Sequence, residues 1–192
     1  MTDVRPETLA RYVERAKSAI GSCDYKLGKG GWSGIAPYPG QSWQDSKTGR
    51  KRTSCDCSGF VAWVLGRSRR PQPTTGKWWF STDVVWRDAL GTLTKTAKTQ
   101  RQMFKQVDLA DAKAGDIVVY PDQYSATGRK LSEGHIAILV DVEARLIVDC
   151  SSSRNGVTQR GATPFFDMVK EGKPLRGDKH QVVCRYNPAG WP

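Results

Sequence analysis

The sequence predicts one α+β domain, in which a helix that carries a cysteine packs on a central antiparallel β-sheet. Residues 57–65 form a short apolar run with helical spacing, and from residue 115 onward several apolar segments rich in β-branched residues alternate with turns. The chain has 192 residues, 38% of them hydrophobic, so it can bury a full core without disulfides. No repeat or low-complexity linker divides it, so we expect a single domain over residues 1–192.

The first expected element is an amphipathic helix that begins near Pro6 and ends at Gly21. Its apolar face consists of Leu9, Tyr12, Val13, Ala16 and Ile20. The segment lacks the apolar region of a signal peptide, and no stretch approaches the ~20 apolar residues that span a bilayer. We therefore expect synthesis in the cytoplasm without a signal peptide and no membrane span, so that export would need another route.

The cysteine helix occupies the stretch CDCSGFVAWVLG, residues 55–66. Ser54 or Asp56 can cap it, and Cys57 falls in its first turn. Unpaired backbone N–H groups and the positive end of the helix dipole stabilise a thiolate over a thiol at such a position. Cysteines more often simply pack in cores, but the polar neighbours Asp56 and Ser58 disfavour that interpretation for Cys57. Cys57 is thus a candidate nucleophile.

A nucleophilic cysteine needs a base, and the chain has two histidines. His180 lies between Lys179 and Gln181, a charged setting typical of the surface. His135 follows a glycine and opens HIAILVD, an apolar run that reads as a buried strand. A second strand over residues 116–120 precedes it, and a polar loop over residues 121–133 joins the two as a hairpin-like pair. We expect His135 to be the base.

A third residue would orient the imidazole. The following strand, RLIVDCSSS, starts at Arg145 and is joined to the His135 strand by a short turn. Antiparallel pairing brings Asp149, an acid out of pattern near its end, to the same end of the sheet as His135. We expect Asp149 to orient the imidazole, with Ser151 and Ser153 as lesser candidates.

The remaining segments include two polar inserts, over about residues 32–53 and 67–107. The second contains two adjacent tryptophans, of which Trp79 is the candidate for lining the cleft, and then a short helix over residues 82–90. Residues 162–172 read as a helix, and a last strand over residues 181–186 closes the sheet.

These motifs resemble the NlpC/P60 family of papain-like cysteine peptidases, which cut peptide stems of bacterial cell walls. The resemblance rests on residues 56–61, 115–120, 134–140 and 147–151, and CDYKLGKGG, residues 23–31, is similar to the family's Tyr-x-x-Gly element. It implies the papain-like fold, with Tyr25 lining the active site and Asp56 and Ser58 helping to hold a substrate amine. The family more often has His, Asn or Gln in the third catalytic position, where this sequence has Asp149.

The expected activity is hydrolysis of an amide bond, and the expected substrate is a peptidoglycan stem peptide. Cys57 attacks the carbonyl, and His135 acts as base and then as acid toward the leaving amine, oriented by Asp149. The backbone N–H of Cys57 and the Tyr25 hydroxyl are the expected oxyanion donors. The expected setting is a phage-type lysin released through a holin, or a toxin injected by a secretion apparatus, acting as a monomer on the wall.

The formal net charge of +11 calls for an anionic partner. Basic and aromatic stretches can indicate nucleic acid, but no helix-turn-helix, RNA-recognition or zinc pattern is present. Anionic cell-wall peptidoglycan attracts the same charge, so we expect the wall rather than nucleic acid as partner. A non-enzymatic basic module that binds nucleic acid or the wall is the alternative.

The other cysteines suggest no chemistry at this level. Cys23, Cys150 and Cys184 read as core residues, and Cys55 is too close to Cys57 for an unstrained disulfide. The C-x-C spacing and the two histidines match zinc sites poorly, so we expect no metal site and no cofactor. A Cys150–Cys184 bridge is open if the protein works outside the cytosol.

Overall fold

The computed structural model describes residues 4–69, 80–93, 101–125, 127–163, 165–166 and 181–190. Its α-helices are α1 (Pro6–Ser18), α2 (Cys57–Val64) and α3 (Thr82–Ala89), and short 3-10 turns cover Leu109–Asp111 and Ser152–Arg154. The strands are β1 (Asp24–Tyr25), β2 (Gln41–Gln44), β3 (Lys51–Cys55), β4 (Phe104–Gln106), β5 (Ile117–Tyr120), β6 (Gln123–Tyr124), β7 (Lys130–Ser132), β8 (His135–Asp141), β9 (Leu146–Ser151), β10 (Gly156–Gly161) and β11 (Val182–Tyr186).

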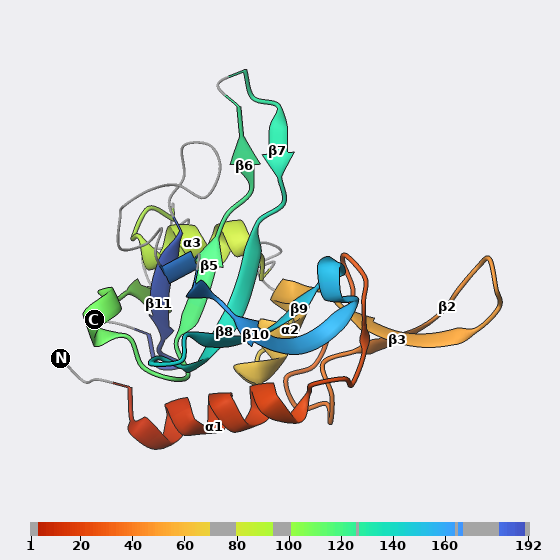
Figure 1. Cartoon of the computed structure of the whole chain (residues 1–192), viewed down its shortest axis with the longest axis horizontal. Coiled ribbons are helices and arrows are strands. Elements are labelled where there is room, and N and C mark those ends of the chain that lie inside the picture. Colours follow the sequence, from red (N-terminus) through yellow and green to blue (C-terminus); the bar gives the residue numbers. More distant parts are fainter. Residues whose placement is uncertain are drawn as a thin grey trace.

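The described strands form one main sheet of six, in the order β10-β9-β8-β5-β11-β4, and all of its pairs are antiparallel. A smaller sheet has the order β1-β3-β2, and β6 and β7 pair with each other. The β6–β7 and β2–β3 hairpins extend away from the body of the domain (Figure 1). The expected α+β architecture, with a helix on an antiparallel sheet, is confirmed.

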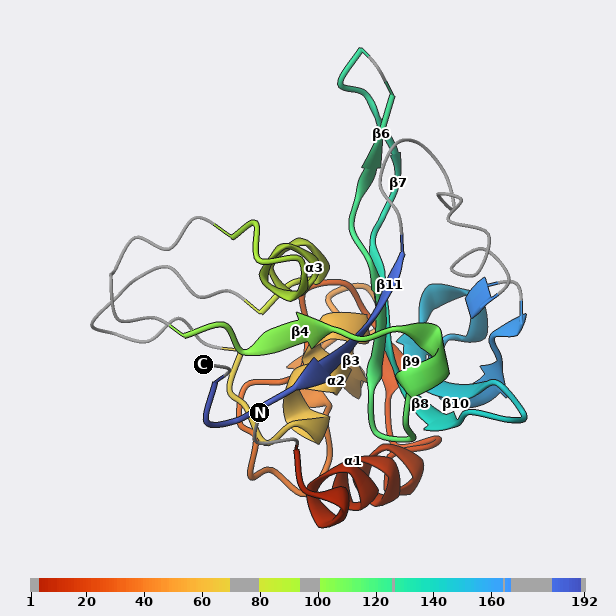
Figure 2. The same ribbon diagram turned by 90° about the vertical axis from the view of Figure 1, so that its left-hand side faces the viewer.

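The core lies between one face of the main sheet and the helices. Helix α2 is buried at all eight positions and packs against β8 and β9. Helix α1 runs along the edge of the domain, with Leu9, Tyr12 and Ala16 buried, and packs on β8 and α2 (Figures 1 and 2). A second, smaller apolar cluster contains other residues of the same strands, such as Val118 and Leu139, together with Phe166 from the segment after β10. Alternating strand residues thus feed two clusters, which explains why β8 reads as a continuous apolar run.

Several expected elements are confirmed and some need correction. The β5–β8 and β8–β9 pairs form as expected. The last strand, β11, does not close the sheet: it lies between β5 and β4, because β4 from the second insert adds the outer strand. The first insert supplies β2 and most of β3, so it is structured rather than loop. Ile20 is not on the buried face, because α1 ends at Ser18 and leaves Ile20 45% exposed.

Three expected features fall wholly or mostly outside the described residues. Trp79 and His180 are both in this group, and the helix expected over residues 162–172 is described only in part. Within the described part of the chain, no helix is long and apolar enough to cross a membrane.

Candidate active site

The candidate nucleophile, Cys57, is the first residue of α2, and Asp56 caps this helix. The Asp56 Oδ1 atom accepts a hydrogen bond from the Gly59 N–H at 2.8 Å and another from the Ser58 hydroxyl at 3.1 Å. The amides of the first helical turn lack intrahelical acceptors, and the cap satisfies the third of them. The amides of Cys57 and Ser58 belong to the same turn, so the positive end of the helix surrounds the Cys57 sulfur.

A glycine-rich loop over residues 28–31 is clamped to the start of this helix. The Gly28 N–H donates to Asp56 Oδ2 at 2.7 Å, and the Asp56 N–H donates to the Lys29 carbonyl at 2.9 Å. Arg69 joins the two segments, donating to Asp56 Oδ1 at 2.8 Å and to the Lys29 carbonyl at 3.1 Å. A Cβ at Gly31 would lie 2.6 Å from the Gly59 carbonyl oxygen, so only glycine permits this approach. The loop fixes the helix start and brings Tyr25 beside it.

His135 and Asp149 meet across two strands. Ile138 pairs with Val148, and continuing this antiparallel register places Asp149 on the same face as His135, diagonally opposite. The His135 Nε2 atom lies 2.6 Å from Asp149 Oδ2. The Asp149 side chain is fully buried, and that of His135 is 17% exposed. Ser151 instead lies 3.4 Å from the Ser153 hydroxyl, so the structure joins Asp149 rather than the serines to the imidazole.

The imidazole of His135 also contacts the Cys57 thiol through a hydrogen bond. Because Nε2 is engaged by Asp149, Nδ1 is the atom left for the sulfur. Burial alone would lower the pKa of His135, but hydrogen bonds with Asp149 and Cys57 and their negative charges outweigh it and raise the pKa to about 9. At neutral pH His135 is therefore an imidazolium that lies between the Asp149 carboxylate and Cys57.

Arg160 is a member of this group that the sequence did not reveal. Thr158 on β10 pairs with Asp149, so Arg160 is again a diagonal neighbour. Its Nε and Nη2 atoms donate to Asp149 Oδ2 at 2.9 and 2.6 Å, on the oxygen that His135 also contacts. Burial would raise the pKa of Asp149, but His135 and Arg160 outweigh it and hold the pKa below its ordinary value. Only the register of the β9–β10 hairpin could have located Arg160 from sequence.

Tyr25 lies beside the nucleophile at the end of β1, where it pairs with Cys55 of β3. Burial and the negative charges of Cys57 and Asp56 raise the pKa of Tyr25 to about 12. The phenol thus keeps its proton at neutral pH, so it can donate a hydrogen bond. The oxyanion role expected for Tyr25 stays a prediction.

The expected substrate contacts are placed differently by the structure. Asp56 is 1% exposed and its two oxygens accept from Gly28, Ser58, Gly59 and Arg69, so its geometry favours a structural role over holding a substrate amine. Ser58 is also buried and donates to Asp56. Trp79 lies outside the described residues.

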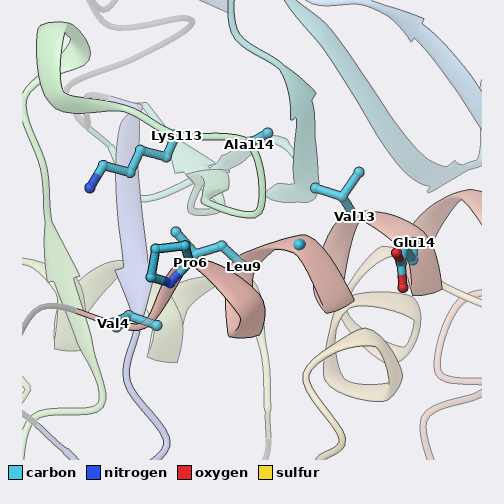
Figure 3. A pocket seen from close by; sticks show the side chains of 8 residues that line it. Val4, Pro6, Leu9, Val13, Glu14, Lys113 and Ala114 are labelled. Carbon is cyan, nitrogen blue, oxygen red and sulfur yellow. The ribbon is translucent and has the colours of Figure 1, made fainter.

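A separate cavity of about 460 Å³ lies along α1 (Figure 3). It is lined by Val4, Pro6, Leu9, Ala10, Val13, Glu14, Lys113 and Ala114. None of these residues belongs to the group around Cys57, so this cavity is not the candidate active site.

Comparison with known proteins finds likeness at the level of solved structures. No protein-family model matches the sequence, and no curated protein matches it. The peptidoglycan hydrolase RipB from Mycobacterium tuberculosis superposes with a TM-score of 0.48 at 18% identity. The match covers 93% of this chain and 64% of the RipB chain. The P60 domain of antigen MAP1204 from M. avium subspecies paratuberculosis gives a TM-score of 0.49 at 16% identity, over 93% of this chain and 94% of the other.

A eukaryotic protein is also among the similar structures. NlpC1 from Trichomonas vaginalis gives a TM-score of 0.47 at 17% identity, over 97% of this chain and 46% of that one. Two of these neighbours, the P60 domain and NlpC1, thus carry the names of the family that the motifs resemble. At such identities and TM-scores the likeness carries no argument about chemistry, which depends on the residues of the site.

Proposed function

We propose that this protein is a cysteine hydrolase that cuts an amide bond in the stem peptides of bacterial peptidoglycan. The observation that carries the proposal is the convergence of Cys57, His135 and Asp149. A thiol at a helix start contacts an imidazole, whose other nitrogen lies 2.6 Å from a buried carboxylate. Nucleophile, base and orienting group in this order are the arrangement of a cysteine hydrolase.

The geometry supports a two-step reaction. Cys57 Sγ, as thiolate, attacks the substrate carbonyl carbon, and the negative oxygen that forms accepts hydrogen bonds from the Cys57 N–H and the Tyr25 hydroxyl. His135 gives its proton to the leaving amine, and the C–N bond breaks to leave a thioester on Cys57. A water molecule, deprotonated by the now neutral His135, attacks the thioester. The C–S bond then breaks, which releases the acid product and leaves Cys57 as a thiolate beside His135, which keeps the proton taken from water.

The charge of the chain supports an anionic, peptide-bearing polymer as substrate. The β2–β3 hairpin presents exposed basic side chains at Lys47, Arg50, Lys51 and Arg52. Positive charge concentrates the enzyme on an anionic wall.

Digestion of purified peptidoglycan sacculi tests the activity and names the bond. The unaltered protein should release soluble fragments that mass spectrometry assigns to one amide, and Cys57→Ala should release none while keeping its circular dichroism spectrum. Iodoacetamide should label Cys57 ahead of Cys55, Cys150 and Cys184, which are fully buried. An active Cys57→Ala protein would remove the hydrolase proposal. Intact sacculi together with tight, salt-sensitive binding of DNA or RNA would favour a basic binding module instead.

We also propose that the enzyme reaches the wall after release by a holin or delivery by a secretion apparatus. Expression in the cytoplasm of a bacterium should then be tolerated, and the same chain directed to the periplasm should lyse the cell. Lysis from the cytoplasm without any release partner would contradict this.

A further inference from the structure

Three buried cysteines meet beside the candidate active site, although the sequence spaces them widely. Cys55 Sγ lies 3.1 Å from Cys23 Sγ and 3.2 Å from Cys150 Sγ. All three sulfur atoms lie within 4.8 Å of one another. Cys55 and Cys150 are fully buried and Cys23 is 9% exposed. Each comes from a different element: the turn after α1, the end of β3 and strand β9.

The donors in this cluster are all sulfur. Among the described residues, no histidine or carboxylate joins the group. Soft thiolate ligands select soft cations such as Cu(I), whereas zinc in structural sites takes four ligands. A disulfide would use two of the three thiols and leave the third beside it. Complete burial of Cys55 and Cys150 also denies a bulky thiol oxidant access to either.

The distances allow a small ion to be held at the centre of the three sulfurs. A metal–sulfur bond of about 2.3 Å in a trigonal arrangement places the sulfurs about 4 Å apart. The two short edges therefore have to open by somewhat under 1 Å, which small side-chain rotations provide. The backbone at Cys55 has little room to move, because Gly30 packs so closely against it that a Cβ at Gly30 would lie 2.2 Å from the Cys55 Cβ.

One of the three sulfurs is accessible from outside. Cys23 is 9% exposed and is the member of the cluster that reaches the surface. An arriving cation therefore meets this thiol first, and its charge favours loss of the thiol protons to solvent.

We propose that Cys23, Cys55 and Cys150 form a three-sulfur site for one soft monovalent cation of the Cu(I) type. The ion would tie the turn after α1 to β3 and β9. Cys55 lies two residues before Cys57, and Cys150 directly follows Asp149. Occupation of the site would thus hold together the segments that carry the nucleophile and the orienting carboxylate. The proposal does not depend on the hydrolase activity.

Anaerobic titration of the reduced full chain with Cu(I), against a competing Cu(I) chelator, tests the site. The Cys57→Ala background removes the reactive thiol. We expect one equivalent of Cu(I) to bind, with ultraviolet sulfur-to-copper charge-transfer absorbance and three sulfur ligands by X-ray absorption. Cys55→Ala should lose this binding. Cys184→Ala is the matched control, because Cys184 is a buried cysteine on β11 outside the cluster, and it should bind as the background does.

Folding of each variant is checked by circular dichroism, and Cys23→Ser or Cys150→Ser replaces Cys55→Ala if that variant does not fold. Weaker binding of Cu(I) than of Zn(II), no stoichiometric binding, or equal binding by all variants would overturn the proposal. So would a reduced protein that binds no metal but loses two hydrogens on mild oxidation with glutathione disulfide, because that result identifies a disulfide pair. Sacculus digestion by the copper-free protein measures the hydrolase activity without the ion, so that failure of one proposal can be told from failure of the other.

Discussion

Arg160 offers the sharpest test of how the candidate site holds its charges. It donates to the same Asp149 oxygen that His135 contacts, with both closest distances at 2.6 Å. Arg160 therefore orients the carboxylate and places a positive charge close to the imidazolium. Replacing it by glutamine keeps a hydrogen-bond donor and removes the charge. Two effects follow, one on the rate and one on the pH profile.

The magnitudes follow from exposure. A hydrogen bond between charged groups contributes about 1.5–3 kcal/mol when buried, but the Arg160 side chain is 34% exposed, so solvent reduces the effect to about 1 kcal/mol. This corresponds to a fall in kcat/KM of roughly 5-fold. Removing a cation near His135 favours the imidazolium, so its pKa rises further. The basic limb of the activity profile should move up by roughly half a pH unit to one.

The assay is the pH dependence of kcat/KM on a soluble muropeptide that sacculus digestion has identified as substrate. Arg160→Gln should show both changes and Arg160→Lys a smaller pH shift, because lysine keeps the charge. Arg154→Gln is the control, since it removes the same charge from the exposed turn between β9 and β10. An unmoved basic limb, or a rate loss matched by an equal fall in melting temperature, would refute the role given to Arg160.

Four further outcomes follow from the site. Asp149→Ala should lower kcat on the order of 10²- to 10⁴-fold and Asp149→Asn less, in steady-state assays; a larger loss in Ser151→Ala would contradict this. Activity should decline as pH rises through about 9, where His135 loses its proton, and a pH–rate profile checks it. The pKa of His135 in the folded protein lies above its ordinary value of 6.5. The stability that its protonation contributes is therefore full below pH 6.5 and is lost as pH rises through 9. Urea midpoints measured against pH would show this loss, and His135→Gln would abolish it. Asp56→Ala should cost about 3–5 kcal/mol of unfolding free energy in urea, because it removes the carboxylate that offsets the buried charge of Arg69 and caps α2, and Ser58→Ala should cost about 1 kcal/mol. Equal losses would contradict the structural role of Asp56.

Local sequence patterns predicted much of the candidate site because each piece lies in a short, regular segment. The apolar spacing and the Asp56 cap predict the helix that begins at Cys57. The strands of His135 and Asp149 are neighbours in the chain, so a hairpin register brings the two side chains together. Such contacts need only the period of a strand and a turn. Their geometry was therefore accessible, and their catalytic roles stay predictions.

The contacts that the sequence did not reveal are those set by tertiary packing. Arg69 reaches Asp56 only because the chain after α2 returns over the glycine loop. Cys23, Cys55 and Cys150 converge from segments separated by 32 and 95 residues. The outer strand β4 forms from an insert because Asp88 of α3 accepts hydrogen bonds from the backbone of residues 103 and 104. No local period signals any of these.

The charges around Cys57 give one reason why each of these distant residues is needed. The thiolate of the proposed function, at the start of α2, would be repelled by the neighbouring carboxylate of Asp56. Arg69 offsets that carboxylate at 2.8 Å, so the cap orders the helix without adding net negative charge. On the other side, Asp149 is offset by Arg160, which would leave the charge of the His135 imidazolium to balance the proposed thiolate. Two acids thus hold the geometry and two arginines neutralise them, and the pair that remains is the one to which the proposed function assigns the reaction.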